Sequence, residues 1–121
     1  MTGDILVVED NPLTAKLYSS IIDEMGVRAR AVPTGEEAID LAANEHPSMV
    51  IMDINLPGMS GVEASQYLRQ IPGLEQLPIL AVTARTEPMF EKFKEIGVFD
   101  ELMFKPVTLS RFKQTIRDCL N

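Results

Sequence analysis

The chain has 121 residues, of which 45% are hydrophobic and 24% charged, proportions that predict one globular domain spanning residues 1–121. The net charge of −7 argues against nucleic acid as a partner, because a phosphate backbone attracts a basic face, and the single cysteine excludes an internal disulfide. The sequence contains neither a signal-like start nor an apolar run of about 18 residues, so we expect a cytoplasmic protein without a membrane partner.

The first strand–helix unit begins with four apolar residues, 5–8, which fit a buried strand that ends at Glu9 and Asp10. Pro12 suits the first turn of a helix, and Gly26 suits its end. The apolar residues between them recur at helical spacing: Tyr18, Ile21, Ile22 and Met25.

The second unit starts at residues 27–32, where apolar residues alternate with arginines as in a half-exposed edge strand. Thr34 and Glu37 form a capping box that opens a helix, and His46, which precedes a proline, ends it. The inward face of this helix is predicted to carry Ala38, Leu41 and Ala42. We expect His46 to be exposed and to have no functional role.

The third unit contains the most informative stretch of the chain. Residues 49–52 are all apolar, as in a strand buried on both faces, and they run directly into Asp53. After a Leu-Pro-Gly turn, Ser60 and Glu63 form another capping box. The stripe of the helix that follows is predicted to carry Ala64, Tyr67, Leu68 and Ile71.

The last two units repeat the pattern. Residues 79–82 predict a buried strand, and Pro88 sits where the next helix would begin. Residues 101–104 predict a short fifth strand, and Thr108 is expected to cap the last helix. The inward faces of these two helices are predicted to carry Met89, Phe93 and Ile96, and then Leu109, Phe112, Ile116 and Leu120.

Five alternating strands and helices predict an α/β fold, one doubly wound (βα)5 sheet with helices on both faces. Parallel strands all end at the same edge of the sheet, which gathers Glu9, Asp10, Asp53, Thr83 and Lys105. Clustered carboxylates share a proton or hold a cation, and an all-oxygen set of donors suits Mg²⁺. Because an ammonium and a hydroxyl lie beside them, we predict a phosphoryl-transfer site with Asp53 as the nucleophile.

Four short motifs at the ends of predicted strands carry a family resemblance. They are Glu9-Asp10, Met-Asp53-Ile-Asn-Leu-Pro-Gly, Val-Thr83-Ala and Lys105-Pro106. Each is weak alone, but in this order they resemble the signature of a response-regulator receiver domain over essentially the whole chain. The resemblance implies a flavodoxin-like sheet with strand order 2-1-3-4-5 and a role in two-component signalling. The single-domain regulators of chemotaxis and of the cell cycle look closest in size.

The resemblance also implies roles for the acidic residues. Asp53 would accept a phosphoryl group from a phosphohistidine on a sensor histidine kinase or a histidine phosphotransfer protein. Asp10 and Asp53 would ligate Mg²⁺ directly, together with the backbone carbonyl of Asn55, and Glu9 would act mostly through water. The domain would catalyse its own phosphotransfer and slow autodephosphorylation, and would switch its binding to a downstream protein or a fused domain.

The remaining site residues follow from the same resemblance. Thr83, Lys105 and a backbone N–H near Ala84 would bind the phosphoryl oxygens, and the bond between Lys105 and the following proline would be cis. Asn55 and Arg85 border the path of an attacking water, so we expect Arg85 to affect the lifetime of the phosphoryl group.

One position departs from the family pattern. Receivers usually carry Tyr or Phe three residues before the lysine, as the partner of the switch residue Thr83, and here that residue is Leu102. Because leucine has no ring to swing, we expect a muted change at an output surface on the fourth helix, fifth strand and fifth helix. The interval from Gly97 to Lys105 also looks one residue longer than expected.

The start of the first helix is a candidate surface for the phosphoryl donor. It would comprise Asn11, Leu13, Thr14 and Leu17, together with Pro106. Two interpretations of Leu13 and Leu17 remain open: either they complete the core, or they form a small apolar patch on which a helical phosphotransfer domain docks.

Other functions fit the sequence less well. A pseudo-receiver, kept only as an interaction module not regulated by phosphorylation, is the main alternative, and the intact set of acids, Thr and Lys argues against it. A haloacid-dehalogenase-like phosphatase would need a second carboxylate where this chain has Asn55. A flavodoxin-like electron carrier would need a Ser/Thr/Gly-rich loop where this chain has Asp-Asn-Pro. Cys119 has no base nearby in sequence, so we expect no reactive thiol.

Overall fold

The computed structural model describes residues 3–84 and 97–121. Within them, five parallel strands form one sheet in the order β2-β1-β3-β4-β5. The strands are β1 (Ile5–Val8), β2 (Ala29–Val32), β3 (Met49–Asp53), β4 (Ile79–Ala84) and β5 (Glu101–Lys105). The helices are α1 (Pro12–Glu24), α2 (Gly35–Glu45), α3 (Gly61–Arg69) and α5 (Leu109–Leu120). The doubly wound fold and its strand order are confirmed, whereas the helix predicted to begin at Pro88 lies outside the described residues.

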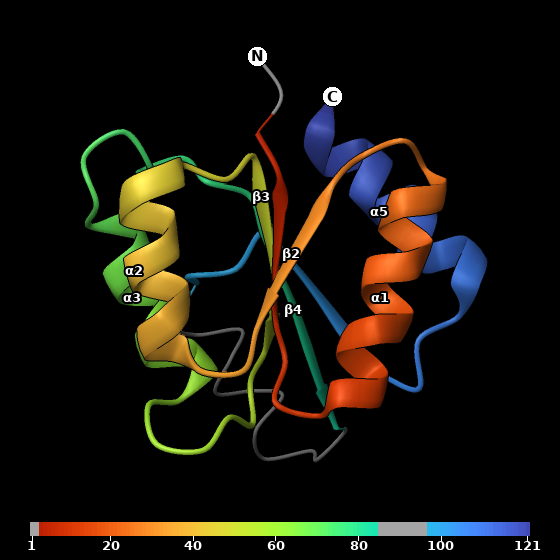
Figure 1. Ribbon diagram of the computed structural model, residues 1–121, viewed down its shortest axis with the longest axis horizontal. Helices are drawn as coiled ribbons and strands as arrows, with labels where there is room; N and C mark the ends of the chain where they lie inside the picture. The colour runs from red at the N-terminus through yellow and green to blue at the C-terminus, as the bar shows by residue number, and fades with distance from the viewer. Residues whose placement is uncertain (1–2, 85–96) are drawn as a thin grey trace.

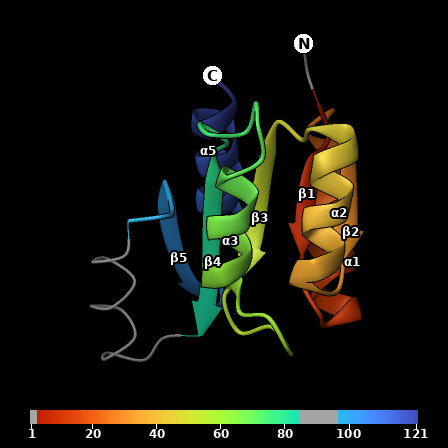
Figure 2. The same ribbon diagram turned by 90° about the vertical axis from the view of Figure 1, so that its left-hand side faces the viewer.

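The sheet lies between two layers of helices (Figure 1). α1 and α5 cover one face and α2 and α3 the other, and Figure 2 shows β5 and β2 at the two edges of the sheet. Ile5 and Val7 of β1 pack in the cluster that contains α1 and α5 residues, whereas Leu6 and Val8 pack with α2 and α3. Because inner strands are covered on both faces, they appear in the sequence as continuous apolar runs.

Two of the predicted capping residues make the expected bonds, and a third does not. Thr34 Oγ1 accepts the N–H of Glu37 at 3.1 Å, and Ser60 Oγ accepts the N–H of Glu63 at 3.2 Å. Thr108 occupies the N-cap position of α5, but its side chain makes no capping hydrogen bond. The Thr108 backbone carbonyl instead accepts the first hydrogen bond of the helix, from the N–H of Phe112 at 2.9 Å.

Two residues that were predicted to face inward are exposed. Tyr67 is 50% exposed, because the buried stripe of α3 passes through Ser65 and Leu68 and leaves the tyrosine on its flank. Leu109 is 53% exposed, since it begins α5 and the buried residues of that helix start one turn later, at Phe112. The helical periodicity was therefore correct, but its inward face was predicted slightly too wide.

The longest described helix, α1, has 13 residues. Among the described residues no helix has both the length and the apolar character needed to cross a membrane.

The carboxyl ends of the strands lie together at the lower edge of the sheet in Figures 1 and 2, on the side away from both termini. β4 extends through Thr83 to Ala84, and β5 extends to Lys105, so both strands run slightly further than predicted. As a result, Thr83 and Lys105 are held within regular strands. The backbone positions of these two residues are therefore fixed by the sheet.

Candidate functional site

Side chains from four strand ends meet at the carboxyl edge of the sheet. Glu9 and Asp10 follow β1, Asp53 ends β3, Thr83 is the penultimate residue of β4, and Lys105 ends β5. The parallel pairing of β1 with β3 brings Glu9 beside Asp53, and the pairing of β4 with β5 brings Lys105 beside the end of β4. The structure thus brings together the five side chains predicted to gather here.

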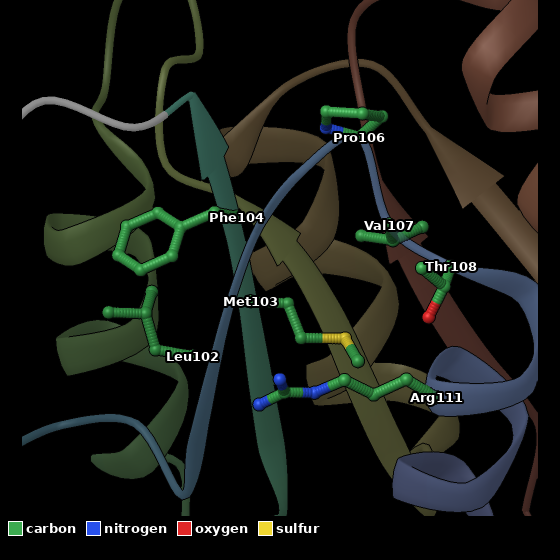
Figure 3. Close-up of a pocket in the computed structure, with 7 residues that line it drawn as sticks. All are labelled: Leu102, Met103, Phe104, Pro106, Val107, Thr108 and Arg111. Carbon is green, nitrogen blue, oxygen red and sulfur yellow. The ribbon is translucent and has the colours of Figure 1, made fainter.

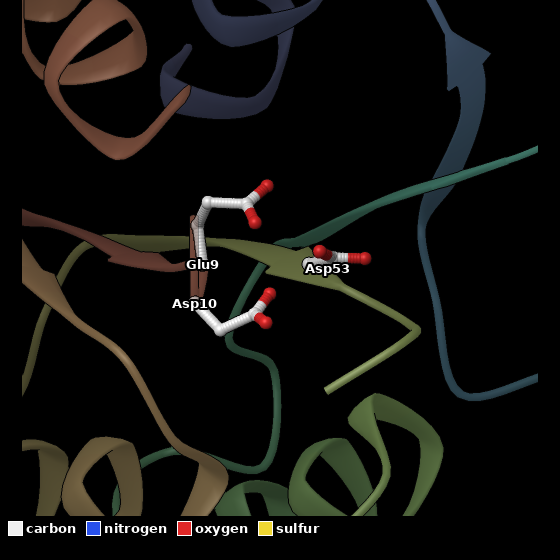
Figure 4. A group of neighbouring side chains, drawn as sticks. All are labelled: Glu9, Asp10 and Asp53. Atoms are coloured by element: carbon white, nitrogen blue, oxygen red, sulfur yellow. The ribbon is translucent and has the colours of Figure 1, made fainter. Parts of the chain in front are cut away.

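The three carboxylates form a compact acidic cluster (Figure 4). Glu9, Asp10 and Asp53 each offer an oxygen, and these oxygens all lie within 4.8 Å of one another. Glu9 and Asp53 are buried, with 3% and 4% of their surface exposed, whereas Asp10 is exposed. Buried like charges at this separation repel strongly, so the cluster needs a neighbouring positive charge.

Lys105 supplies part of that positive charge. Its Nζ donates to Glu9 Oε1 at 3.1 Å and to Asp53 Oδ2 at 3.2 Å. Partial burial alone would lower the pKa of the Lys105 ammonium, but the hydrogen bond to Glu9 and the charge of Asp53 raise it above its usual value. The lysine therefore stays charged at the site.

Glu9 is held on two sides. Its Oε2 accepts the backbone N–H of Asn11 at 3.1 Å, and its Oε1 accepts from Lys105. Burial raises the pKa of the Glu9 carboxyl, and the Asn11 bond partly offsets this effect. The side chain of Asn11 in turn caps α1 by accepting the N–H groups of Leu13 and Thr14 at 3.0 and 3.2 Å. The start of α1 is thereby tied to the acidic cluster.

Asn55 contacts both Asp53 and Thr83. Its backbone N–H donates to Asp53 Oδ1 at 3.0 Å, and its side-chain Nδ2 donates to Thr83 Oγ1 at 3.2 Å. Thr83 Oγ1 itself donates to the carbonyl of Ala84 at 3.3 Å. The sequence did not reveal the contact between Asn55 and Thr83, because it depends on how the loop after β3 folds back over β4.

Gly61 was not singled out from the sequence, although it fixes how the loop after β3 turns into α3. A Cβ at this position would overlap the backbone oxygen of Asp53, and would lie 2.8 Å from the Cα of Ile54. The Gly61 N–H also donates to the Ile54 carbonyl at 3.1 Å. Only glycine allows the helix to begin so close to the strand end. The sequence signal that could have identified this glycine is its position directly after Ser60, the residue that caps α3.

The donor set fits a hard divalent cation. It consists of the oxygens of three carboxylates, and the carboxylates of Glu9 and Asp53 are buried. Oxygen ligands of this kind suit Mg²⁺ or Ca²⁺ and do not suit softer metals. Such a cation would neutralise charge that Lys105 leaves uncompensated.

The Lys105–Pro106 peptide bond is cis, which confirms that prediction. The structure also decides between the two interpretations of the surface predicted to bind the phosphoryl donor. Leu13 is 80% exposed and Leu17 is 56% exposed. These two leucines therefore do not complete the core, and the first of the two interpretations is wrong. Asn11 and Pro106 are exposed as well, and Thr14 is half-buried.

Leu102 and Phe104 lie on the same side of β5, with Met103 on the other (Figure 3). Leu102 packs against a small cluster that contains Ile54 and Ala81. Phe104, in contrast, is the direct cross-strand partner of Thr83. Phe104 was not singled out from the sequence, because the family pattern points to the position three residues before the lysine.

A cavity of about 420 Å³ lies beside these residues. It is lined by Leu102, Met103, Phe104, Pro106, Val107, Thr108 and Arg111 (Figure 3). The predicted contribution of the fourth helix, and that of Arg85, fall outside the described residues.

Among curated proteins, the chain is similar to the polar-differentiation response regulator DivK of Brucella ovis. The two are 36% identical over 120 residues, which cover 99% of this chain and 98% of that protein. The DivK protein of Brucella anthropi is 34% identical with the same coverage.

Solved structures show the same architecture. The signal receiver domain of a histidine kinase from Syntrophus aciditrophicus superposes with a TM-score of 0.90 at 28% identity, covering 98% of this chain and 90% of that one. The receiver domain of a sensor histidine kinase from Pseudomonas aeruginosa, solved with a magnesium ion in its active-site cleft, gives a TM-score of 0.89 at 24% identity, covering 99% and 98%. A family model described as the response regulator receiver domain matches residues 5–117. The chain therefore belongs to the response regulator receiver domain family and acts in two-component signalling.

Proposed function

We propose that residues 1–121 form one active receiver domain, in which Asp53 accepts a phosphoryl group from a phosphohistidine of a sensor histidine kinase or a histidine phosphotransfer protein. The observation that carries the proposal is the pairing of the buried Asp53 with Lys105, at 3.2 Å, inside a cluster of three carboxylates. An acid that only stabilised a loop would need neither the lysine nor the two further carboxylates.

The reaction would form a bond between an Asp53 carboxylate oxygen and phosphorus while the phosphorus–nitrogen bond of the donor breaks. Asp53 Oδ1 is held by the N–H of Asn55 and Oδ2 faces Lys105, so the carboxylate is oriented before a donor arrives. Lys105, the Thr83 hydroxyl and a backbone N–H near Ala84 would bind the transferred oxygens. Later attack of water would release inorganic phosphate and restore the carboxylate.

Asp10, Asp53 and the backbone carbonyl of Asn55 would hold Mg²⁺, with Glu9 acting through water. When bound, the cation would neutralise the carboxylates and allow an anionic donor to approach. Both carboxylate oxygens of Glu9 already accept hydrogen bonds, from Asn11 and Lys105, which supports a role for Glu9 through water and not as a direct metal ligand. Phosphorylation would then change the binding of a downstream protein or fused domain.

The first prediction tests this chemistry directly. Incubation with a small phosphodonor and Mg²⁺ should add one phosphoryl group per chain, which intact mass spectrometry detects. Asp53→Asn should abolish the addition, because the amide is not a nucleophile, and excess chelator should suppress it. Asp118→Asn is a matched control, since Asp118 is exposed on α5. If the wild-type protein takes up no phosphoryl group, the chain is an interaction module not regulated by phosphorylation.

The second prediction concerns the donor. We propose that Leu13 and Leu17 form an apolar patch, bordered by Asn11, Thr14 and Pro106, on which the helical donor domain docks. Transient interfaces are small, so truncation of one central apolar residue can cost about 1–2 kcal/mol, roughly five- to thirtyfold in affinity. Leu13→Ala and Leu17→Ala should therefore slow phosphotransfer from the cognate donor protein by about this factor.

The same two variants should react normally with a small phosphodonor, because the chemistry at Asp53 is intact. Tyr67→Ala is the control, since Tyr67 is a comparably exposed apolar residue on the opposite face of the sheet. Unchanged phosphotransfer rates in both leucine variants would show that the donor docks elsewhere.

A further inference from the structure

We propose that Asn55 is a positioning residue that restrains the Thr83 hydroxyl in the unphosphorylated protein, and that a phosphoryl group on Asp53 must displace the Asn55 amide to engage Thr83. The inference rests on the proposed function of Asp53, and assigns to the Asn55 side chain a role in the resting state of the site.

The geometry gives Asn55 two connections at once. Its backbone N–H donates to Asp53 Oδ1 at 3.0 Å, and its side-chain amide donates to Thr83 Oγ1 at 3.2 Å. One residue of the loop after β3 thus links the carboxylate that would be phosphorylated to the hydroxyl that would bind the phosphoryl oxygens. A change at Asp53 and a change at Thr83 are therefore mechanically coupled through this loop.

The hydrogen bonds of Thr83 explain why the amide acts as a restraint. A hydroxyl has one proton to donate, and Thr83 currently directs it at the carbonyl of Ala84, at a long 3.3 Å. The amide of Asn55 occupies a lone pair on the same oxygen. Because Thr83 is 1% exposed, water has little access to replace either partner. Engaging a phosphoryl oxygen requires the hydroxyl to redirect its proton away from the Ala84 carbonyl. A rotation about χ1 that carries Oγ1 toward the phosphoryl group also breaks the bond from the Asn55 amide.

Thr83 therefore has two competing arrangements: in the resting one its hydroxyl bonds to Asn55 and Ala84, and in the other it bonds to a phosphoryl oxygen. The Asn55 amide stabilises the resting arrangement. A partly buried hydrogen bond of this kind changes an equilibrium by about two- to tenfold. Removing the amide should shift Thr83 toward the arrangement that a phosphoryl group stabilises, and should raise the affinity for a phosphoryl analogue by about that factor.

The first arm of the test uses the resting protein, without metal or phosphodonor. The chemical shifts of the Thr83 methyl group and the couplings that report its χ1 angle are measured in wild type and in Asn55→Ala. We expect both to change, and to remain unchanged in the control Asn44→Ala, which removes an exposed asparagine of α2 that donates to Asp40. An unchanged Thr83 signal in Asn55→Ala would overturn the proposal, whether or not Asp53 can be phosphorylated.

The second arm is a double-mutant cycle on the affinity for beryllofluoride with Mg²⁺. In the wild-type background, Asn55→Ala should raise the affinity about two- to tenfold. In a Thr83→Val background, which lacks the hydroxyl, the same substitution should have no effect. An equal effect in both backgrounds would show that Asn55 acts independently of Thr83. Failure of the wild type to bind beryllofluoride would instead count against the proposed function, and the first arm would still decide the role of Asn55.

Discussion

Among the described residues, Lys105 is a cation that forms ion pairs with the buried carboxylates of the site. It lies 3.1 Å from Glu9 and 3.2 Å from Asp53, and both acids are almost fully buried. Removing one partner from such a group leaves the others uncompensated, which costs more than the pair itself contributes. The lysine therefore has a structural role in addition to its proposed contact with the phosphoryl group.

The third prediction follows from this arrangement. Lys105→Met should lower the free energy of unfolding by about 1.5–3 kcal/mol at pH 7, the range for hydrogen bonds to charged groups. Mg²⁺ should restore part of the loss, because it supplies positive charge to the same carboxylates. Urea unfolding with and without Mg²⁺ measures both effects, and Lys16→Met, an exposed lysine of α1, is the control.

The loss of stability caused by Lys105→Met should also depend on pH, and the pKa of Glu9 sets the direction. Its pKa is raised above the ordinary value of 4.5, chiefly by burial, so the folded state holds its proton more tightly than the unfolded state. The contribution of Glu9 to stability therefore falls as the pH rises from below 4.5 through the raised value. The destabilisation caused by Lys105→Met should be smaller at pH 4 than at pH 7. An equal loss at both pH values would contradict this account.

The identities of the site residues could be predicted because the ends of the strands follow from local patterns, whereas the order of the strands in the sheet was implied by the family resemblance. Glu9, Asp53 and Lys105 each directly follow or end an apolar run, and parallel strands bring such positions to one edge. The hydrogen bonds between them could not be predicted. Whether Lys105 bonds to Glu9, or Asn55 to Thr83, depends on side-chain directions that only the folded loops define.

At the scale of elements, Asp100 shows how the segment before β5 is tied to the rest of the fold. Asp100 connects three segments: its N–H donates to the Ile79 carbonyl at 3.0 Å, and its Oδ2 accepts the Ile79 N–H at 2.8 Å. The same oxygen accepts from Arg69 Nη2, at the end of α3, at 2.8 Å. The segment before β5 thereby fixes the start of β4 and the end of α3.

The fourth prediction tests this connection. Asp100→Ala should lower the free energy of unfolding by about 1–3 kcal/mol, because it leaves the Ile79 N–H and the Arg69 guanidinium without their carboxylate. Asp100→Asn should cost less, since an amide oxygen can still accept both bonds. Chemical denaturation of the two variants gives the comparison. A cost for Asp100→Ala within about 0.5 kcal/mol, the usual range of surface substitutions, would show that the contact is not needed.

Helix periodicity predicted where the helices lie but not the width of their buried faces. Tyr67 follows the same spacing as its neighbours and yet remains half exposed, because α3 packs through the smaller Ser65. The sequence alone does not contain the distance between a helix and the sheet. That distance decides which of two adjacent residues fits underneath.

At the scale of the whole molecule, the proposed site and the expected output surface share β5. Lys105 ends this strand at the acidic cluster, and the strand also lines the cavity that extends to Val107 and Arg111 at the start of α5. Phe104 pairs with Thr83 across the strands, whereas Leu102 pairs with Ala81. A displacement of Thr83 at the site would therefore reach the ring of Phe104 before it reaches Leu102.

The fifth prediction concerns this route. Addition of beryllofluoride and Mg²⁺ should perturb backbone amide shifts at the site and also along β5 and the start of α5. The change should be small, because Leu102 has no ring to exchange positions with Thr83, and a ligand shifts an equilibrium only by its differential affinity for the two states. Phe104→Ala should reduce the perturbation beyond Lys105, whereas Leu102→Ala should leave it nearly unchanged.

Comparing the two variants distinguishes a route through Phe104 from a route through Leu102, the position at which receivers usually carry the aromatic switch. The comparison is matched, because both substitutions remove half-buried apolar groups from the same side of the same strand. A larger loss in Leu102→Ala would show that the position three residues before the lysine keeps its role even without an aromatic ring. If the site responds while residues 101–120 do not, the output surface lies elsewhere on the molecule. A response along β5 that depends on Phe104 would instead show that Thr83 is coupled to the output surface through Phe104, its direct cross-strand partner, and not through Leu102, two residues earlier.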